Sequence, residues 1–281
     1  MNTTLRRTSL LALTAVMLAG CGSATEEPVA AATSDPNTLR VGMECNYAPY
    51  NWSTTTETET SKKISEVDYC DGYDVMMATK LAEETNKEVQ IVKLDWDNLI
   101  LSLQNDQIDA VIAGMTATED RKKEVEFTEP YYVSTEVLVV KKDSDLADAD
   151  SLDDFSGRKV VGQMNTLYDT IIDQIEGVQH EPAAETFPAA IQALQSGAVE
   201  AVTSELPVAK GVVAANPDLK YIEFEDGKGF VDTDNSAAVA IAVKKGNTEL
   251  RDSLQEALDK ISDEEREEMM MQAVNNQPAS N

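Results

Sequence analysis

Two segments of the chain align with each other without a gap, and they decide the fold. Residues 96–114 read WDNLILSLQNDQIDAVIAG, and residues 187–205 read FPAAIQALQSGAVEAVTSE. In each segment, apolar residues at helical spacing are followed by a short turn and an apolar run typical of a buried strand. Trp96 falls on Phe187 at the start of the alignment. Whether or not the two segments share an origin, the chain is expected to hold two α/β units of similar design.

The rest of the sequence alternates between strand and helix patterns. Apolar runs predict strands at residues 39–43, 88–94, 107–114, 135–142, 158–163, 198–204 and 236–245. Helical spacing predicts helices at residues 74–85, 97–106, 167–175, 188–197 and, as the terminal helix, 247–261. This alternation indicates an α/β fold with two mixed, mostly parallel sheets flanked by helices.

The two long strands near residues 135–142 and 236–245 are the expected crossings between the units, and therefore the hinge. They divide the folded part into a first lobe and a second lobe. The first lobe is predicted to comprise residues 38–137 plus 238–281, and the second lobe residues 138–237.

Composition narrows the classes of function. The 281 residues include 51 acidic and 23 basic side chains, for a formal charge of −28, and 42% of the chain is hydrophobic. A chain of this kind can bury a core, and its acid excess is typical of a solvated surface. Nucleic acid is not an expected partner, because phosphate backbones bind basic surfaces.

The N-terminus has the pattern of an export signal. It reads MNTTLRRTSLLALTAVMLAGC, with two arginines, an apolar run from Leu10 to Ala19 and small residues before Cys21. The run is too short for a permanent transmembrane helix. LAGC is similar to a bacterial lipobox, in which the cysteine is lipidated, as by palmitate, and becomes the mature N-terminus. An ordinary signal peptide with a chance cysteine is the alternative.

The mature chain is therefore expected to be exported and lipid-anchored through Cys21 to the outer face of the cytoplasmic membrane. Residues 1–20 form the predicted signal peptide, and residues 21–37 form a small, polar, proline-containing tether.

Cys45 and Cys70 are the cysteines that remain after signal removal. An exported pair in an oxidising compartment is a candidate disulfide. The bond would close a loop over an insertion at residues 53–69, which is rich in Thr, Ser and Glu. Two free or metal-binding thiols are the alternative.

A short loop after the first repeat has the residues of a carboxylate clamp. Residues 114–121 read GMTATEDR. Thr118 is a good helix N-cap, and backbone N–H groups before a helix favour an anion. Thr116 adds a hydroxyl donor, and Arg121 adds a planar fork that matches two carboxylate oxygens. The alternative is that Arg121 pairs with a glutamate of its own helix.

Four strand ends are expected to converge on one cleft between the lobes, because ligands of open α/β sheets lie beyond the carboxyl ends of the strands. They are the loop with Gly114, the stretches MECNY (43–47) and QMNTL (163–167), and Glu205. Glu205 ends an apolar strand, where a carboxylate is poorly suited to a core and well suited to an ammonium group. A carboxylate clamp and an opposing acid are what an α-amino acid requires.

These features resemble the substrate-binding proteins of polar amino acid ABC importers, from about residue 38 to residue 265. The resemblance is carried by YAPY (47–50), DGYDVMMATKLA (71–82), residues 96–132, VGQMNT (161–166) and VTSEL (202–206). It implies a two-lobed, type II periplasmic-binding-protein-like fold whose cleft closes about a hinge. It also implies a monomer without cofactor or metal, which captures a free amino acid and delivers it to a membrane permease.

The resemblance assigns the backbone groups of the amino acid to particular residues. The α-carboxylate is expected to contact Arg121, Thr116, the Gly114 region and Thr166, and Met115 and Asn165 are further candidate ligand-binding residues. Glu205 is expected to bind the α-ammonium, although aspartate is more usual there in the family. Met76 stands where an acid is common, and the insertion between the cysteines exceeds the family's minimum.

Side-chain specificity depends on a second set of residues. Members that take lysine, arginine, ornithine or histidine have an acid like Glu44 near the cationic head and aromatic rings like Tyr47 and Trp96 along the stem. Asp74 would add a second negative group. Such an arrangement pairs the charge and covers the stem. Glutamine binders also have an acid like Glu44, so glutamine or another polar amino acid is the alternative, and Trp96 alone is compatible with core packing.

An enzyme is the main rival class, because some exported proteins of this fold are dehydratases acting on cyclic carboxylic acids. The one histidine, His180, is expected at the surface and forms no convincing triad with a serine and an acid. Phosphate-loop and calcium-loop motifs are absent from the sequence. A ligand-sensing module that hands its closed form to a partner other than a permease is a further alternative.

Overall fold

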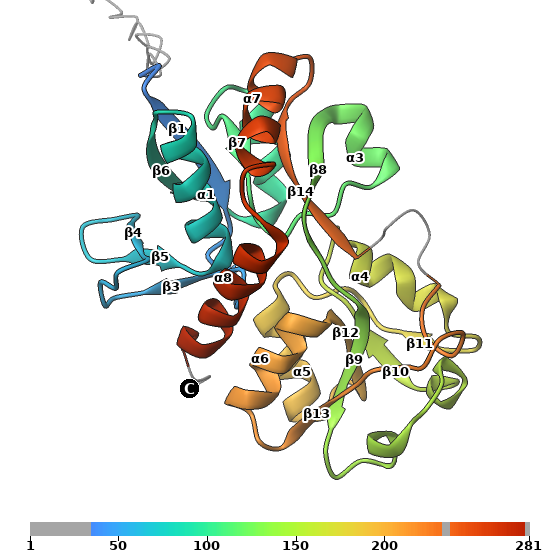
Figure 1. Ribbon diagram of the computed structural model, residues 1–281. Helices are drawn as coiled ribbons and strands as arrows, with labels where there is room; N and C mark the ends of the chain where they lie inside the picture. Colours follow the sequence, from blue (N-terminus) through green and yellow to red (C-terminus); the bar gives the residue numbers. More distant parts are fainter. Residues whose placement is uncertain (1–34, 232–236, 279–281) are drawn as a thin grey trace, which may run out of the picture. The chain divides into compact units, whose positions relative to one another are not determined.

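The computed structural model describes residues 35–231 and 237–278, which contain two five-stranded sheets (Figure 1). In spatial order the first sheet is β6 (Glu88–Lys93), β1 (Thr38–Met43), β7 (Ala110–Val111), β14 (Ala238–Lys244) and β8 (Val125–Val133). The second is β11 (Gln179–His180), β10 (Lys159–Val161), β12 (Ala201–Glu205), β9 (Glu136–Lys141) and β13 (Leu219–Ile222).

Both sheets follow one pattern. The first three strands are parallel, and the fourth and fifth strands are each antiparallel to the strand before them. The two aligned sequence segments supply β7 and β12, which are the third strands of their sheets. The predicted pair of mixed sheets in an α/β fold is therefore confirmed.

Helices flank both sheets. They are α1 (Tyr73–Glu84), α2 (Leu99–Gln104), α3 (Glu119–Glu124), α4 (Leu167–Thr170), α5 (Phe187–Ser196), α6 (Leu206–Ala215), α7 (Thr248–Leu258) and α8 (Asp263–Asn276). Short 3-10 turns are η1 (Trp96–Asn98), η2 (Asp145–Asp148), η3 (Leu152–Phe155) and η4 (Ile171–Gln174). α1 packs on β1 and β6, and α6 packs on β9, β12 and β13.

The chain passes from the first sheet to the second over two residues. β8 ends at Val133 and β9 begins at Glu136. The return runs from β13 to β14 and includes residues 232–236, which lie outside the described residues. The strands predicted near 135–142 and 236–245 are confirmed as β9 and β14, and each is the fourth strand of its sheet.

A disulfide joins Cys45 to Cys70, as the sequence predicted. The insertion between the cysteines folds into a small antiparallel sheet of β2 (Asn46–Tyr47), β3 (Asn51–Thr54), β5 (Tyr69–Asp71) and β4 (Lys62–Lys63), in that spatial order. The hydroxyls of Thr58 and Thr60 each donate to the buried carboxylate of Asp71 at 2.7 Å. Threonines of the insertion thus provide the hydrogen-bond donors for this buried carboxylate.

Several sequence predictions need correction. The helix predicted over 167–175 is a single turn, α4, followed by η4; its backbone at Asp169 lies so close to Gly162 that a side chain at that glycine would have no room. The predicted terminal helix, α7, is followed by α8, which Ser262 caps by accepting from the backbone N–H of Glu265. The signal peptide, lipidated Cys21 and most of the tether lie outside the described residues.

Helix α8 touches helices of both sheets. It packs on α1 and on α6, and Lys80 of α1 forms an ion pair with Glu265 of α8. On the α6 side, the carboxamide of Gln277, just beyond α8, fills the space that a side chain at Gly211 would occupy. The chain terminus is thereby packed against both halves of the fold.

Two absences hold for the described residues alone. No helix in residues 35–231 and 237–278 has the length and apolar character to cross a membrane. No three His, Cys, Asp or Glu side chains in the same ranges gather closely enough to hold a metal ion.

Candidate functional site

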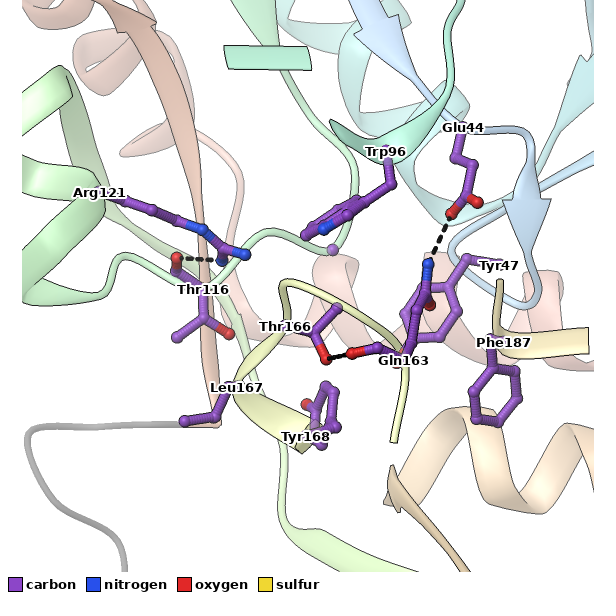
Figure 2. A pocket seen from close by; sticks show the side chains of 11 residues that line it. Glu44, Tyr47, Trp96, Thr116, Arg121, Gln163, Thr166, Leu167, Tyr168 and Phe187 are labelled. Carbon is purple, nitrogen blue, oxygen red and sulfur yellow. Dashed lines mark hydrogen bonds between the residues drawn. The ribbon is translucent and has the colours of Figure 1, made fainter. Parts of the chain in front are cut away.

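A small cavity lies where strand ends of the two sheets meet (Figure 2). It measures about 20 Å³ and is lined by Glu44, Tyr47, Trp96, Gly114, Thr116, Arg121, Gln163, Thr166, Leu167, Tyr168 and Phe187. A volume of this size holds about one water molecule. The arrangement is therefore a closed one, in which the lining side chains or the sheets must move for an amino acid to enter.

Arg121 projects into one end of the cavity from α3. The helix starts where the sequence predicted, since the hydroxyl of Thr118 accepts from the backbone N–H of Arg121 at 3.3 Å. The guanidinium donates from Nη1 to the carbonyl of Thr116 at 2.9 Å and from Nη2 to the carbonyl of Asn165 at 2.8 Å. Its Cζ lies 5.1 Å from the ring centroid of Trp96. The fork is thus oriented by neutral oxygens and by an aromatic face.

The acids beside Arg121 are engaged elsewhere. Glu119 pairs with Lys122 at 2.8 Å, and Asp120 pairs with Lys123 at 2.6 Å. Within the described part of the chain, Arg121 makes no ion pair of its own. Burial lowers the pKa of Arg121 to about 10, so the side chain is still a cation at neutral pH. A partly desolvated cation held by carbonyls has strong attraction for an incoming carboxylate.

A buried chain of hydrogen bonds fixes the loop at Gly114. The backbone N–H of Gly114 donates to the hydroxyl of Tyr131 at 3.0 Å, and that hydroxyl donates to Asp74 at 2.6 Å. Asn51 donates a second bond to Asp74 at 2.7 Å. Gly114 has φ +61, and a side chain there would lie 3.3 Å from the ring of Tyr47. Asp74 therefore supports the loop from behind and does not line the cavity.

The second sheet contributes the loop after β10. The hydroxyl of Thr166 lines the cavity and donates to the carbonyl of Gln163 at 2.7 Å. Asn165, at φ +57, accepts at its carbonyl from Arg121 and from the indole of Trp96, the latter at 3.2 Å. The carboxamide of Asn165 donates to Asp97 at 2.8 Å. Asn165 thus joins the two halves beside the cavity, and with Met115 it lines a separate outer depression.

Glu44 and Tyr47 lie at the end of the cavity away from Arg121 (Figure 2). Glu44 is 7% exposed, and burial raises its pKa. One of its oxygens accepts from the carboxamide of Gln163 at 3.4 Å, a contact that crosses from the second sheet to the first. Glu44 is thus a buried acceptor with a weak, long hydrogen bond.

Glu205 is fully buried behind the cavity. Its two oxygens accept from the hydroxyls of Tyr47 at 2.7 Å and Tyr50 at 2.6 Å. Both tyrosines come from the YAPY stretch after β1. Because glutamate is longer than aspartate by one carbon, its carboxylate reaches these hydroxyls, and Glu205 does not line the cavity in the closed arrangement. Contact with an ammonium group requires Glu205, or the side chains that cover it, to move.

Burial raises the pKa of Glu205 to about 7, against the opposing effect of the tyrosine bonds. The folded state therefore favours the protonated acid, and this stabilisation, complete below the unfolded pKa near 4.5, is lost as pH rises through about 7. Replacing Glu205 by Gln should increase the free energy of unfolding at pH 8. We expect this gain to shrink by about 2 kcal/mol at pH 5, as measured by urea denaturation. A gain independent of pH, or an equal trend in exposed Glu256→Gln, would contradict the assignment.

The structure thus divides the predicted site residues into two groups. Glu44, Tyr47, Trp96, Gly114, Thr116, Arg121 and Thr166 surround the cavity. Met115 and Asn165 lie beside it, and Asp74 and Glu205 lie behind it. The lining residues Gln163, Leu167, Tyr168 and Phe187 were missed as site residues. Phe187 had a signal in the sequence, since it aligns with Trp96.

The fold and the cavity define a protein that encloses a small solute between the strand ends of two similar sheets. The chain belongs to family 3 of the bacterial extracellular solute-binding proteins, whose sequence profile matches residues 39–273. This membership confirms a binding protein rather than an enzyme, and an exported one.

Named relatives bind amino acids. The chain is 29% identical over 224 residues to a probable histidine-binding protein of Campylobacter jejuni, covering 79% of this chain and 82% of that protein. It is 29% identical over 276 residues to the ABC transporter glutamine-binding protein GlnH of Bacillus subtilis, covering 96% and 97%. An ancestral arginine-binding protein, solved with arginine bound, is 32% identical with a TM-score of 0.69 and covers 84% of this chain and 97% of its own. The type II fold of the amino acid-binding proteins is thereby confirmed.

Proposed function

We propose that the protein captures a free amino acid with a cationic side chain and delivers it to the permease of an ABC importer. One observation carries this proposal: a single cavity has a guanidinium, Arg121, at one end and a buried carboxylate, Glu44, at the other. The ring of Trp96 lies between them, and the ring of Tyr47 lies beside Glu44 (Figure 2). These groups complement the carboxylate, the cationic head and the apolar stem of one molecule.

Charge balance favours a cationic ligand over a neutral one. Glu44 is the acid that lines the cavity; among the described residues it makes no ion pair, and its hydrogen-bond donor is the neutral carboxamide of Gln163. An amino acid with an uncharged side chain adds no net charge, whereas lysine, ornithine or arginine adds one positive charge. Buried charges are stable only when they are compensated. A cationic ligand supplies part of the compensation that this cleft lacks.

The proposed contacts follow from the closed geometry. The carboxylate takes the place of the carbonyl of Asn165 on Arg121 and accepts from Thr116, the Gly114 loop and Thr166. The α-ammonium draws Glu205 away from its tyrosine hydroxyls. Hinge movement lies where the chain crosses between the sheets. The proposed lobe limits are residues 135/136, because β9 of the second sheet begins at Glu136, and the predicted 237/238. Ligand stabilises closure through the contacts that the second sheet adds.

Glutamine is the second candidate, and a specific contact favours it. Glu44 already accepts a hydrogen bond from a carboxamide, that of Gln163. The amide of a glutamine ligand would make the same kind of bond at the same acid. The two candidates therefore differ in one respect, whether the group at Glu44 is charged.

A thermal-shift panel of the standard amino acids plus ornithine tests the proposal. A ligand at a hundredfold excess over its Kd stabilises by about 2.7 kcal/mol, which corresponds to a rise in Tm of about 5 to 10 °C for a chain of this size. We expect this rise with cationic amino acids and a smaller one with glutamine. A rise with glutamine alone would select the second candidate, and no rise with any amino acid would refute both.

Anchoring and partnership complete the proposal. A lipid on Cys21 holds the mature monomer at the outer face of the cytoplasmic membrane, and residues up to about 37 act as the tether. The intact mass of the chain extracted from membranes tests this, since a mature N-terminus other than modified Cys21 would refute it. Loss of amino acid uptake on deleting the permease in a transport assay would separate an importer subunit from a ligand-sensing module.

A further inference from the structure

Phe187 belongs to the cavity although the binding roles proposed above do not use it. The internal repeat places it at the position of Trp96, and the structure gives the two residues equivalent settings. Trp96 begins η1 after β6, and Phe187 begins α5. Both side chains line the cavity. Each half of the fold thus supplies one aromatic residue from the same point of its repeat.

The ring of Phe187 is held firmly. Thr186 caps α5 by accepting from the backbone N–H of Ala189 at 3.3 Å, and Pro188 restricts the first turn of the helix. Phe187 is 6% exposed, and its ring meets that of Tyr47 edge to face, with centroids 5.4 Å apart at 87°. Tyr47 comes from the first half of the fold, so the ring contact forms across the cleft.

Phe187 lies at the end of the cavity opposite Arg121. Figure 2 shows Arg121 and Thr116 at one end, and Phe187 beside Tyr47 and Gln163 at the other. A ligand whose carboxylate binds Arg121 extends its side chain toward Phe187. The ring offers no hydrogen-bond acceptor, so a cationic head group that reaches it loses the hydrogen bonds that it makes with water and gains none in their place.

We propose that Phe187 is a specificity-determining residue that sets the length of the side chain accepted by the closed cleft. The inference rests on the proposed function, because it needs an amino acid anchored at Arg121. A side chain of the right length directs its head to Glu44, whereas a longer one meets the fixed ring of Phe187 and prevents closure. The aromatic pair with Tyr47 defines the position at which the cleft stops closing.

A series of diamino acids of increasing length tests this. 2,3-Diaminopropionate, 2,4-diaminobutyrate, ornithine, lysine and homolysine share the same charged groups and differ by single methylenes. Calorimetry should give wild-type protein one optimal length, with at least tenfold weaker binding of the longest member. Phe187→Ala should move the optimum to a longer member and improve the affinity ratio of longest to optimal at least tenfold. Phe187→Leu, which keeps more of the packing, should show a smaller shift.

The controls separate a specificity role from a structural one. Phe230→Leu removes an edge-to-face ring partner of Phe224 away from the cavity and should leave the optimal length unchanged. An unchanged optimum in both Phe187 variants, with uniformly weaker binding, would overturn the inference while leaving the proposed function intact. Failure of wild-type protein to bind any member or any other amino acid would instead refute the proposed function. If Phe187→Ala does not fold, the Phe187→Leu series decides.

Discussion

Arg121→Ala should abolish amino acid binding in calorimetry, with affinity at least about a hundredfold weaker for every amino acid that binds the wild type. The guanidinium is the cavity's cation, and the acids next to it on α3 are paired with Lys122 and Lys123. Two charge-assisted hydrogen bonds to a carboxylate contribute about 3 to 5 kcal/mol in a partly buried site. Because the α-carboxylate is common to all amino acids, the loss should not depend on the side chain.

Two further variants sharpen the Arg121 prediction. Arg121→Lys keeps the charge but loses the planar fork, and we expect intermediate affinity. Lys122→Ala removes a neighbouring cation of α3 that points to solvent, and it should have little effect. Undiminished binding by Arg121→Ala would refute the carboxylate clamp. Equal losses in Arg121→Ala and Lys122→Ala would indicate damage to α3 rather than a lost contact.

Glu44→Gln should exchange the preference between charged and amide side chains. The buried carboxylate pairs a cationic head, and removing one partner of a buried charge pair costs about 2 kcal/mol or more. We expect arginine or lysine to bind at least about thirtyfold more weakly, as measured by calorimetry. Glutamine should change far less, because a carboxamide at position 44 can still accept from an amide.

The matched control for Glu44 is Asp95→Asn. Asp95 is an exposed acid whose charge acts on Glu44 through space. Its removal should weaken cationic ligands only slightly, and less so at higher salt. Equal losses of arginine and glutamine binding in Glu44→Gln would contradict the proposal that Glu44 distinguishes ligands by the head group of their side chain. No loss of either would exclude contact between Glu44 and the ligand.

The topology was predictable because the internal repeat is a local signal. Helical spacing followed by an apolar run identified α5 and β12, and alignment with residues 96–114 showed that the same unit occurs twice. The residues at the Arg121 end of the cavity were equally predictable from the sequence, since Thr118 and Arg121 lie in one short loop and helix. Such features depend on residues close together in the sequence, so they can be predicted from the known preferences of helix caps and strand ends.

Residues whose position depends on contacts distant in sequence were harder to place. Nothing local in VTSEL shows that Glu205 meets the hydroxyls of Tyr47 and Tyr50, which precede it by more than a hundred residues. Asp74 looked like a second ligand group, but its partner Tyr131 lies on β8, a strand that the sequence patterns did not predict. The small sheet of the insertion was missed because its strands are short and polar.

Helix α8 has a consequence for affinity that the cavity does not reveal. It rests on α1, which covers the first sheet, and on α6, which covers the second. When the sheets separate, at least one of these contacts has to slide or be lost. The balance between open and closed protein therefore includes a contribution from packing remote from the ligand, and apparent affinity depends on that balance. The packing of the C-terminal helix can thus raise or lower the affinity for all amino acids by the same factor. The cavity residues determine which amino acid binds most tightly.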